Sequence, residues 1–461
     1  MPKVMPIYGT RPEAIKVAPI VKALQADERF ECVVTVTGQH REMLDQVNEL
    51  FGIVPDHDLN IIQPRQTLNG VFARTLDGLD AVLEQERPDA VVVQGDTTTS
   101  TAGAVAAFNR GIPVVHAEAG LRSFDILSPF PEEANRKITS QISALHLPPT
   151  TVSRDNLLRE AVAAEDVYVT GNTVIDALLE AVGHQVPFED ERLAELEASG
   201  RRVVLVTTHR RENQGDAMRG VGRALARLAA DHPEVTFVLP AHRNPVVREA
   251  ILPEIEGREN VLVTEPLAYG EFTHLLSVAT VVLTDSGGVQ EEAPSLGKPV
   301  LVMRENTERP EAVTAGTVRL IGTDEEVVVT EVTRLLTDEA AYAAMSQAVN
   351  PYGDGLAAER TVSAWASGCR PSTAPEPHRT PGRGHPVEAT RPPPPAGTAA
   401  SCVPRLHPSS RGVTRASSGR TGGRDPVRGQ PGTIGTLVSG ARHHARAPSR
   451  MTPPVSANAH P

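Results

Sequence analysis

Cysteine and aromatic residues are both scarce in this sequence. Its three cysteines, Cys32, Cys369 and Cys402, are too few and too scattered for a disulfide framework or a CxxC metal site. Aromatic residues make up only 3% of the chain, so any core must consist mainly of Val, Leu, Ile and Ala. Such a core is typical of parallel β-sheets that are covered by helices.

Long apolar runs and an excess of positive charge are also absent. No apolar run reaches the length of about 20 residues that a transmembrane helix needs. The first residues, MPKVMPIYGTRPE, contain no separate apolar segment followed by a cleavage site, so they do not resemble a signal peptide. The formal net charge of -12 argues against nucleic acid as a main partner. We therefore expect a cytoplasmic protein that binds neither nucleic acid nor membranes.

Short apolar runs alternate with helix-length amphipathic stretches along most of the chain. This alternation predicts βαβ units and parallel sheets, and 461 residues suffice for at least two domains. The predicted strands of the first half are Val4–Tyr8, Cys32–Thr37, Ala90–Gln94, Ile112–Ala117 and Val167–Thr170, with helices near 12–26, 41–51, 67–86, 98–109, 131–145 and 151–162. Those of the second half are Val203–Thr207, Val235–Leu239, Val261–Val263, Val281–Thr284, Pro299–Val302 and Val318–Ile321.

The alternating pattern loosens around GHQVPFED, residues 183–190. We interpret this stretch as a hinge, and we predict one α/β domain over 1–182 and a second over 183–365. Two such domains that face each other form a cleft. Ligands of open α/β sheets bind beyond the carboxyl ends of the strands, so this cleft is the expected binding site.

Composition changes abruptly after about Trp365. From residue 366 to 461 the chain is mostly Pro, Gly, Ser, Thr and Arg, without lysine, and its only acidic residues are Glu376, Glu388 and Asp425. Such a segment cannot bury enough apolar surface to offset its conformational entropy, so we predict a disordered C-terminal tail. Its basic character could suggest nucleic-acid or membrane contact. Out-of-frame reading of a GC-rich gene gives the same composition, and we favour that hypothesis.

The stretch TDSGGVQEEAPSLGKPV joins a predicted strand to a predicted helix. Gly287 and Gly288 let the backbone turn tightly and come close to a ligand. The free N–H groups and the positive dipole end of the following helix favour an anion, most often a phosphate. An ordinary βα connection would show the same pattern, so this stretch alone does not decide.

The sequence GTRPEAIK follows the first predicted strand. Thr10 and Glu13 form a capping-box pattern, and Pro12 suits the first helical turn. The pattern places Arg11 at a helix start that faces the cleft, where a guanidinium can pair with a phosphate, and Lys16 follows one turn later. An arginine that caps a neighbouring loop and a solvated lysine are equally compatible with this pattern.

Carboxylates follow two predicted strands and open one predicted helix. Asp96 and Glu118 come directly after strands, and PFPEEANRK places Glu132 and Glu133 in a first helical turn. The α/β proteins place reactive groups at the carboxyl ends of strands. Any one of these acids could be merely a helix cap, but carboxylates crowded in a cleft acquire the separated pKa values that acid–base catalysis needs.

Histidines follow two predicted strands of the second half. His209 lies in THRREN, and His242 lies in PAHRNP after the next strand. A histidine there could be a satisfied core residue. Its position toward the same cleft favours contact with a phosphate or a role in proton transfer.

With these residues assembled, the chain resembles the non-hydrolysing UDP-N-acetylglucosamine 2-epimerases, which interconvert UDP-GlcNAc and UDP-ManNAc. The similarity runs in order from about residue 3 to 360, and it is far more specific than a single glycine motif. The matching stretches are GTRPEAIK, QHREMLDQV, GDTTT, HAEAGLR, PFPEEANR, GNTVIDALL, THRREN, LTDSGGVQEEAPSLGKPVLVMR, TERPEAV and NPYGDG.

The resemblance implies two Rossmann-like domains around a central cleft, the arrangement called GT-B. It also implies a homodimer that needs no cofactor and no metal, and that supplies ManNAc units for cell-surface polysaccharide. The implied substrate-binding residues are Arg11, Phe272 at the uracil, Ser286, Gly287 and Gly288 at the diphosphate, and Glu292 at the ribose. The implied catalytic residues are Asp96, Glu118, Glu132, His209 and Lys16.

Members of this family are activated by a second UDP-GlcNAc beside the first. Gln39, Arg65, Arg210 and His242 match that site, to which Glu132 also belongs. Position 42 is Glu where some relatives have Gln. The likeness to the family fades near residues 362–365. If the last helix is altered there, closure and stability of the domains could be impaired.

Three other functions share part of this pattern. A GT-B glycosyltransferase has a similar nucleotide-binding half but does not need the acids Asp96, Glu118 and Glu132. A hydrolysing epimerase releases free ManNAc and UDP, and only the matched second site argues against it. A UDP-sugar-binding regulator without activity would not need the acids or His209.

Overall fold

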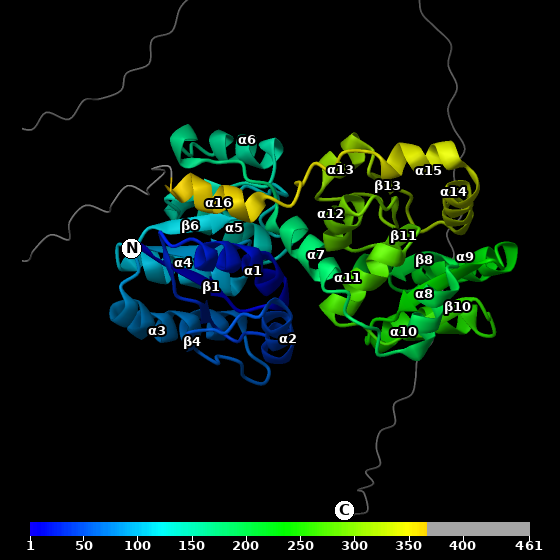
Figure 1. Cartoon of the computed structure of the whole chain (residues 1–461), viewed down its shortest axis with the longest axis horizontal. Coiled ribbons are helices and arrows are strands. Elements are labelled where there is room, and N and C mark those ends of the chain that lie inside the picture. Colours follow the sequence, from blue (N-terminus) through cyan, green and yellow to red (C-terminus); the bar gives the residue numbers. More distant parts are fainter. Residues whose placement is uncertain (367–461) are drawn as a thin grey trace, which may run out of the picture. The chain divides into compact units, whose positions relative to one another are not determined.

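The computed structural model describes residues 1–366, so the predicted tail lies outside the described residues apart from Ala366. Two β-sheets form in this part of the chain, and every pair of neighbouring strands in them is parallel. We call each sheet with its helices a lobe (Figure 1). The predicted fold class, two α/β units built on parallel sheets, is confirmed.

The first sheet has the strand order β4-β3-β1-β5-β6-β7, with β2 beside β1. Its strands are β1 (Lys3–Tyr8), β2 (Glu31–Cys32), β3 (Thr35–Val36), β4 (His57–Asp58), β5 (Ala90–Gln94), β6 (Val114–Ala117) and β7 (Leu145–Leu147). The helices of this lobe are α1 (Arg11–Ala26), α2 (Arg41–Phe51), α3 (Leu68–Glu86), α4 (Thr98–Asn109), α5 (Glu132–Ile142) and α6 (Thr151–Arg159).

The second sheet has the strand order β10-β9-β8-β11-β12-β13. Its strands are β8 (Arg202–Thr207), β9 (Val235–Pro240), β10 (Val261–Thr264), β11 (Val281–Thr284), β12 (Val300–Val302) and β13 (Val318–Leu320). The remaining helices are α7 (Thr173–Gly183), α8 (Glu191–Ser199), α9 (Asp216–Asp231), α10 (Pro245–Ile255), α11 (Tyr269–Val278), α12 (Gly287–Ser295), α13 (Pro310–Ala315), α14 (Glu325–Thr337), α15 (Glu339–Ser346) and α16 (Ala357–Ala366).

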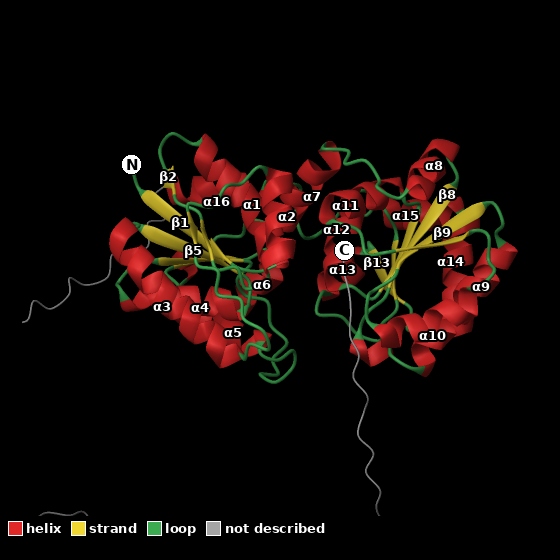
Figure 2. Cartoon of the chain, turned by 90° about the horizontal axis from the view of Figure 1, so that it is seen from below, coloured by secondary structure: helices red, strands yellow, loops and turns green. Residues whose placement is uncertain are grey.

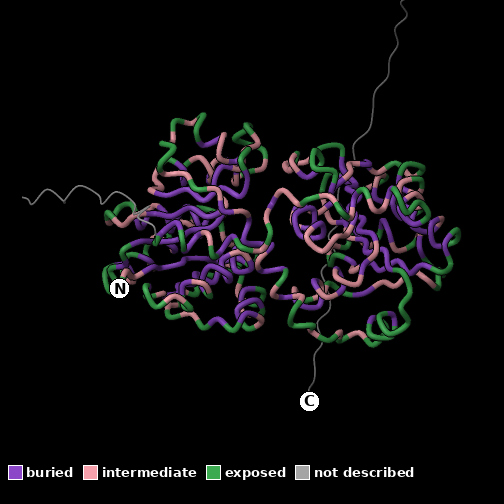
Figure 3. Tube along the Cα trace, turned by 45° about the horizontal axis from the view of Figure 1, so that its top comes forward, coloured by how far each residue is buried: buried purple, intermediate pink, exposed green. Residues whose placement is uncertain are grey.

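Helices cover both faces of each sheet, which explains the near-continuous apolar composition of the strands (Figure 2). All five residues of β5 and all four of β11 are buried, and Figure 3 shows the buried segments in the middle of each lobe. Core side chains are mainly Val, Leu, Ile and Ala, as the scarcity of aromatic residues predicted. One apolar cluster continues from α1 through α7 to α11 and α12, so the two lobes share part of their core.

Helix α16 packs on the first lobe although it follows the second lobe in the chain (Figure 1). Its Val362 and Trp365 belong to the same buried cluster as Val4 and Leu24, and the rings of Trp365 and Phe30 meet edge to face at 6.2 Å. The end of the predicted second domain, from residue 357 onward, therefore lies against the first lobe. The chain crosses between the lobes twice, through α7 and again before α16.

Two strand predictions differ from the structure. Residues 167–170 form no strand, and only Val167 makes an isolated bridge, to His146. The strand at this edge is instead Leu145–Leu147, which begins at the last residue of the helix predicted near 131–145. Pro148 and Pro149 follow it, and because proline has no N–H to donate, the ladder cannot continue.

The helix start after β1 forms as predicted through Glu13. The Glu13 carboxylate accepts hydrogen bonds from the backbone N–H groups of Thr10 at 2.8 Å and Gly9 at 3.0 Å. The Thr97 hydroxyl donates to its other oxygen at 2.6 Å. These bonds fix the start of α1, and with it Arg11, at the carboxyl edge of the first sheet.

No helix within residues 1–366 combines the length and the apolar composition that a membrane crossing requires.

Candidate active site

A cleft of about 430 Å³ lies at the carboxyl ends of strands from both sheets. Residues from the α1 start, the β8 and β9 ends, α11 and the α12 start line it. Those singled out from the sequence are Arg11, Lys16, His209, His242, Phe272, Ser286, Gly288 and Glu292. A larger hollow of about 670 Å³, lined by residues of α8, α10 and β10, contains none of the predicted site residues. The cleft is therefore the candidate active site.

The start of α12 has the features that suit an anion. Ser286 is the N-cap, and its side chain makes no capping hydrogen bond. A Cβ atom on Gly287 would lie 2.7 Å from Nη1 of Arg309 and 3.4 Å from Nη2 of Arg210. Both guanidinium groups thus approach the helix start as closely as a glycine allows, and Arg11 also lines the cleft. Free N–H groups and three arginines favour a strongly anionic ligand.

Arg309 is a site residue that the sequence analysis did not single out. A signal was available, because the sequence RPEA occurs twice, at 11–14 and at 309–312. Each copy opens a helix with proline in its first turn. Arg11 and Arg309 both line the cleft, one from each copy.

His209 is oriented by Asp285, a second residue whose role the sequence did not reveal. Nδ1 of His209 lies 3.1 Å from Oδ1 of the buried Asp285. Burial alone would raise the pKa of Asp285, but hydrogen bonds from His209 and from the backbone N–H of Arg210 hold it below its ordinary value. The His209 ring also stacks on His242, with 5.9 Å between ring centroids. An ionised Asp285 favours the tautomer in which Nδ1 of His209 carries the proton.

Lys16 and Glu118 form a part-buried ion pair, and Lys16 lines the cleft. Nζ of Lys16 lies 2.5 and 2.7 Å from the two oxygens of Glu118, and Gln94 also donates to this carboxylate. Burial alone would raise the pKa of Glu118, but the Lys16 ammonium holds it below its ordinary value. Glu118 is therefore ionised near neutral pH, as a proton acceptor must be.

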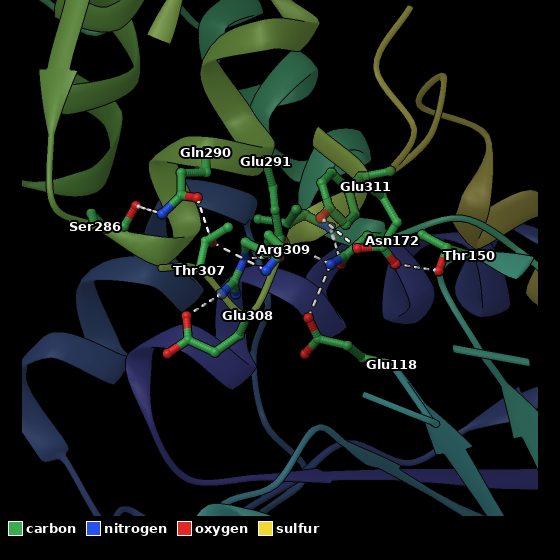
Figure 4. Close-up of polar contacts among 12 residues, drawn as sticks. Glu118, Thr150, Asn172, Ser286, Gln290, Glu291, Thr307, Glu308, Arg309 and Glu311 are labelled. Carbon is green, nitrogen blue, oxygen red and sulfur yellow. Dashed lines mark hydrogen bonds and ion pairs between the residues drawn. The ribbon is translucent and has the colours of Figure 1, made fainter. Parts of the chain in front are cut away.

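A second ion pair, the part-buried Arg309 with the buried Glu291, lies near Glu118 (Figure 4). Asn172 links the two pairs, because its Nδ2 donates to Glu118 at 3.0 Å and to Glu291 at 2.9 Å. The guanidinium that faces the cleft is thus held from behind by a carboxylate. The same network reaches the acid–base candidate Glu118 in the other lobe.

Glu292 lines the cleft, and within residues 1–366 it forms no ion pair. The Tyr269 hydroxyl donates to its Oε1 at 3.0 Å. Burial raises the pKa of Glu292 to about 7, and the neighbouring Glu291 adds to this increase. The pair of glutamates that follows the glycines therefore divides into one carboxylate that binds an arginine and one that faces the ligand space.

At pH 8 we expect Glu292→Gln to raise the free energy of unfolding by on the order of 1–3 kcal/mol. The unfolded chain loses the Glu292 proton near its ordinary pKa of 4.5, whereas the folded protein keeps it to about pH 7. Stability from this group is therefore lost as pH rises through that window. The uncharged amide removes this loss, so urea unfolding of variant and wild type should differ at pH 8 and converge below pH 4.5.

Glu291→Gln is the matched control for this prediction. It leaves Arg309 buried without its carboxylate, so the free energy of unfolding should fall by about 3 kcal/mol. Equal effects of the two substitutions at pH 8 would contradict the different environments of the neighbouring glutamates.

Asp96 and Glu132 do not line the cleft. The Asp96 carboxylate pairs with Arg136, whose Nη2 lies 2.6 Å away, and Glu132 is the half-buried first residue of α5. Both lie at the same edge of the first sheet as Glu118, as predicted from the strand ends. Of these three acids, only Glu118 is connected to the cleft, by its contact with Lys16.

The predicted second-site residues come from both lobes, Gln39 and Arg65 from the first and Arg210 and His242 from the second. His242 lines the cleft and Arg210 reaches the α12 start. Gln39 accepts a hydrogen bond from the Thr99 hydroxyl at 2.7 Å, and Arg65 is exposed with a positive φ of 55°. Across residues 1–366, no three His, Cys, Asp or Glu side chains are grouped as metal ligands would be.

Comparison with known proteins identifies the family. A family model described as UDP-N-acetylglucosamine 2-epimerase matches residues 22–366. The UDP-N-acetylglucosamine 2-epimerase of Escherichia coli (strain K12) is 54% identical over 368 residues, which is 78% of this chain and 98% of that protein. The enzyme of the same name from Salmonella typhimurium is 53% identical over 371 residues, 79% of this chain and 98% of that protein.

Solved structures agree with the sequence relatives. The UDP-GlcNAc 2-epimerase from Neisseria meningitidis bound to UDP-GlcNAc has 45% sequence identity and a TM-score of 0.72, covering 79% of this chain and 100% of that one. The Methanocaldococcus jannaschii enzyme in complex with UDP-GlcNAc and UDP has 33% identity and a TM-score of 0.66, with the same coverage. The chain therefore belongs to the UDP-N-acetylglucosamine 2-epimerase family.

Proposed function

We propose that this protein interconverts UDP-N-acetylglucosamine and UDP-N-acetylmannosamine by eliminating UDP and adding it back. One observation carries the proposal: a single cleft is lined both by a helix start suited to an anion and by Lys16, whose ammonium pairs with the part-buried carboxylate of Glu118. The first group suits a diphosphate, and the second suits proton transfer. Membership of the epimerase family and relatives solved with UDP-GlcNAc support the substrate.

The chemistry explains why both groups are needed. The C2 hydrogen of a sugar nucleotide is not acidic, because its neighbours cannot delocalise a carbanion as a carbonyl would. When a carboxylate takes the C2 proton, the C–H electron pair forms a C1=C2 double bond, and the C1–O electron pair leaves with UDP. Addition reverses these changes, and C2 receives its proton on the opposite face.

The second lobe and Arg11 stabilise the departing diphosphate in this proposal. Arg11, Arg309 and His209 line the space in front of the α12 start. Charge that develops on the leaving oxygens meets positive groups that are already in place, which is the most effective form of electrostatic catalysis. In this proposal Phe272 packs on the uracil and Glu292 binds the ribose hydroxyls, and the position of both residues in the lining of the cleft supports these roles.

The first lobe supplies the acid–base groups. Glu118 is the nearest candidate, since its partner Lys16 lines the cleft. Asp96 and Glu132 lie at the same sheet edge and are the candidates for the second face of C2. Two groups are required because one carboxylate cannot serve both faces of the ring.

The products of purified protein and UDP-GlcNAc test this function. Chromatography should separate UDP-ManNAc as the main product, together with remaining UDP-GlcNAc. Free ManNAc and UDP in equal amounts would identify a hydrolysing epimerase instead. Sugar transfer to an added acceptor, with UDP released, would identify a glycosyltransferase.

We expect the substrate to activate its own turnover. Gln39, Arg65, Arg210 and His242 would hold a second UDP-GlcNAc, and occupation of that site would favour the closed cleft, a coupling between two sites. Turnover from UDP-ManNAc alone should be slow and should rise when traces of UDP-GlcNAc are added. Arg65→Gln should remove this increase, and equal hyperbolic kinetics in both directions, without a lag, would contradict it.

A homodimer is the proposed assembly. The loop between β6 and α5 presents Phe124, Ile126, Leu127 and Phe130, each more than half exposed. Apolar side chains gathered in this way are typical of a surface that another protein covers. Analytical ultracentrifugation of the whole chain measures the state directly, and a monomer at micromolar concentration would contradict it.

A further inference from the structure

Asn172 stands where the two crossings between the lobes meet. It is the N-cap of α7, through which the chain enters the second lobe, and its backbone N–H donates to the carbonyl of Tyr352 at 2.7 Å. Tyr352 lies in the segment that returns to the first lobe. The neighbouring Asn350 donates to the backbone carbonyl of Glu291 at 2.8 Å. Both crossings are thus tied to the same turn of α12.

Every polar atom of the Asn172 side chain has a partner. Its Oδ1 accepts from the backbone N–H of Val174 at 3.1 Å, which caps α7. This bond fixes the amide orientation, so both N–H groups of Nδ2 face the carboxylates of Glu118 and Glu291. The residue is buried, and no side chain without two donors can make both contacts.

The two carboxylates that Asn172 joins belong to different lobes and hold different cations. Glu118 pairs with Lys16 in the first lobe, and Glu291 pairs with Arg309 in the second. Figure 4 shows Asn172 between Glu118 and Glu291. The contacts run without a break from Lys16 to Arg309. Two carboxylates at short range repel each other, and the amide between them donates a hydrogen bond to each and so adds to the stabilisation by their own cations.

We infer that Asn172 is a positioning residue that couples the phosphate-binding arginine of the second lobe to the acid–base carboxylate of the first. This inference rests on the proposed function, because it uses the roles given there to Arg309 and Glu118. A diphosphate bound in the cleft would share the positive charge of Arg309. Glu291 would then rely more on its hydrogen bond from Asn172. Occupation of the phosphate site thereby changes the hydrogen bonding that Asn172 offers to Glu118. Such coupling between two sites is reciprocal.

Two substitutions separate positioning from simple support of the helix. Asp and Ser are both preferred N-cap residues, so Asn172→Asp and Asn172→Ser keep the start of α7. Serine replaces the two amide N–H donors by one hydroxyl on a shorter side chain, and aspartate places a third carboxylate between the other two. Turnover should fall by about tenfold to a hundredfold, and the acidic limb of the pH profile of kcat should move to higher pH, further for Asp than for Ser.

Asn260→Asp is the matched control. Nδ2 of Asn260 donates to three backbone carbonyls beside β10, at the amino ends of the strands and away from the cleft. The Asn260→Asp substitution should lower the urea midpoint of unfolding without moving the pH profile of kcat. Slower turnover with an unmoved acidic limb in both Asn172 variants, or an equal movement in Asn260→Asp, would overturn the inference.

The wild type distinguishes the two possible failures. Wild-type protein that forms no UDP-ManNAc overturns the proposed function and this inference together. If the wild-type protein epimerises and the Asn172 variants keep its kcat and its pH profile, the inference alone is overturned.

Discussion

Replacing Glu118 by glutamine is expected to lower turnover by about a hundredfold or more. Glutamine keeps the size of the side chain but cannot take a proton. Glu118 contacts the cleft-lining Lys16, which keeps this carboxylate ionised. Loss of a group that removes the C2 proton should act on kcat, with a smaller change in the Kd of UDP. Asp96→Asn should act in the same direction if Asp96 serves the other face.

Glu180→Gln is the control for Glu118→Gln. Lys22 and Glu180 form another Lys–Glu pair between α1 and α7, but at the surface. Exposed pairs contribute little to stability, so turnover should stay within about twofold of wild type. Thermal unfolding of each variant separates loss of chemistry from loss of fold. Full activity of both Glu118→Gln and Asp96→Asn would remove these two acids from the mechanism.

Replacing Arg309 by methionine is expected to weaken UDP binding by about tenfold to a hundredfold, as loss of a charge-assisted hydrogen bond does. It should also lower the free energy of unfolding by about 3 kcal/mol, because Glu291 then remains buried without its cation. Isothermal titration with UDP measures the first effect, and urea unfolding measures the second.

Arg304→Met separates these two effects. Arg304 is also buried and pairs with Glu212 and Glu308, but it does not line the cleft. Its loss should lower stability and change the Kd of UDP by no more than about threefold, since no charge-assisted contact to the ligand is lost. Equal weakening of UDP binding in both variants would show that Arg309 acts only through the fold.

The sequence predicted the sheets because their strands are short, covered apolar runs. Ten of the predicted strand runs contain strands of the structure, although Cys32–Thr37 divides into β2 and β3. The site followed from the strands, since His209 and Ser286 come directly after β8 and β11. The two strands β4 and β7 were missed because each has only two or three residues, too few for any periodicity to appear.

Contacts between distant segments could not be predicted from the same patterns. The sequence of α16 does not indicate which sheet the helix packs on. We therefore assigned it to the second domain from its position in the chain. The partners of Asn172 lie 54 and 119 residues away, and no local pattern specifies them. Arg309 lies between these cases, because the repeated RPEA distinguishes it by sequence alone, whereas its pairing with Glu291 is a contact of the fold.

The source of the hydrogen that C2 receives tests the central claim most directly. The wild-type protein is incubated with UDP-GlcNAc in deuterium oxide, and the UDP-ManNAc formed is analysed by proton NMR and mass spectrometry. Epimerisation by elimination and re-addition, with acid–base groups open to solvent exchange, predicts one deuterium at C2 of the product. UDP-ManNAc that retains its original hydrogen at C2 would contradict this mechanism.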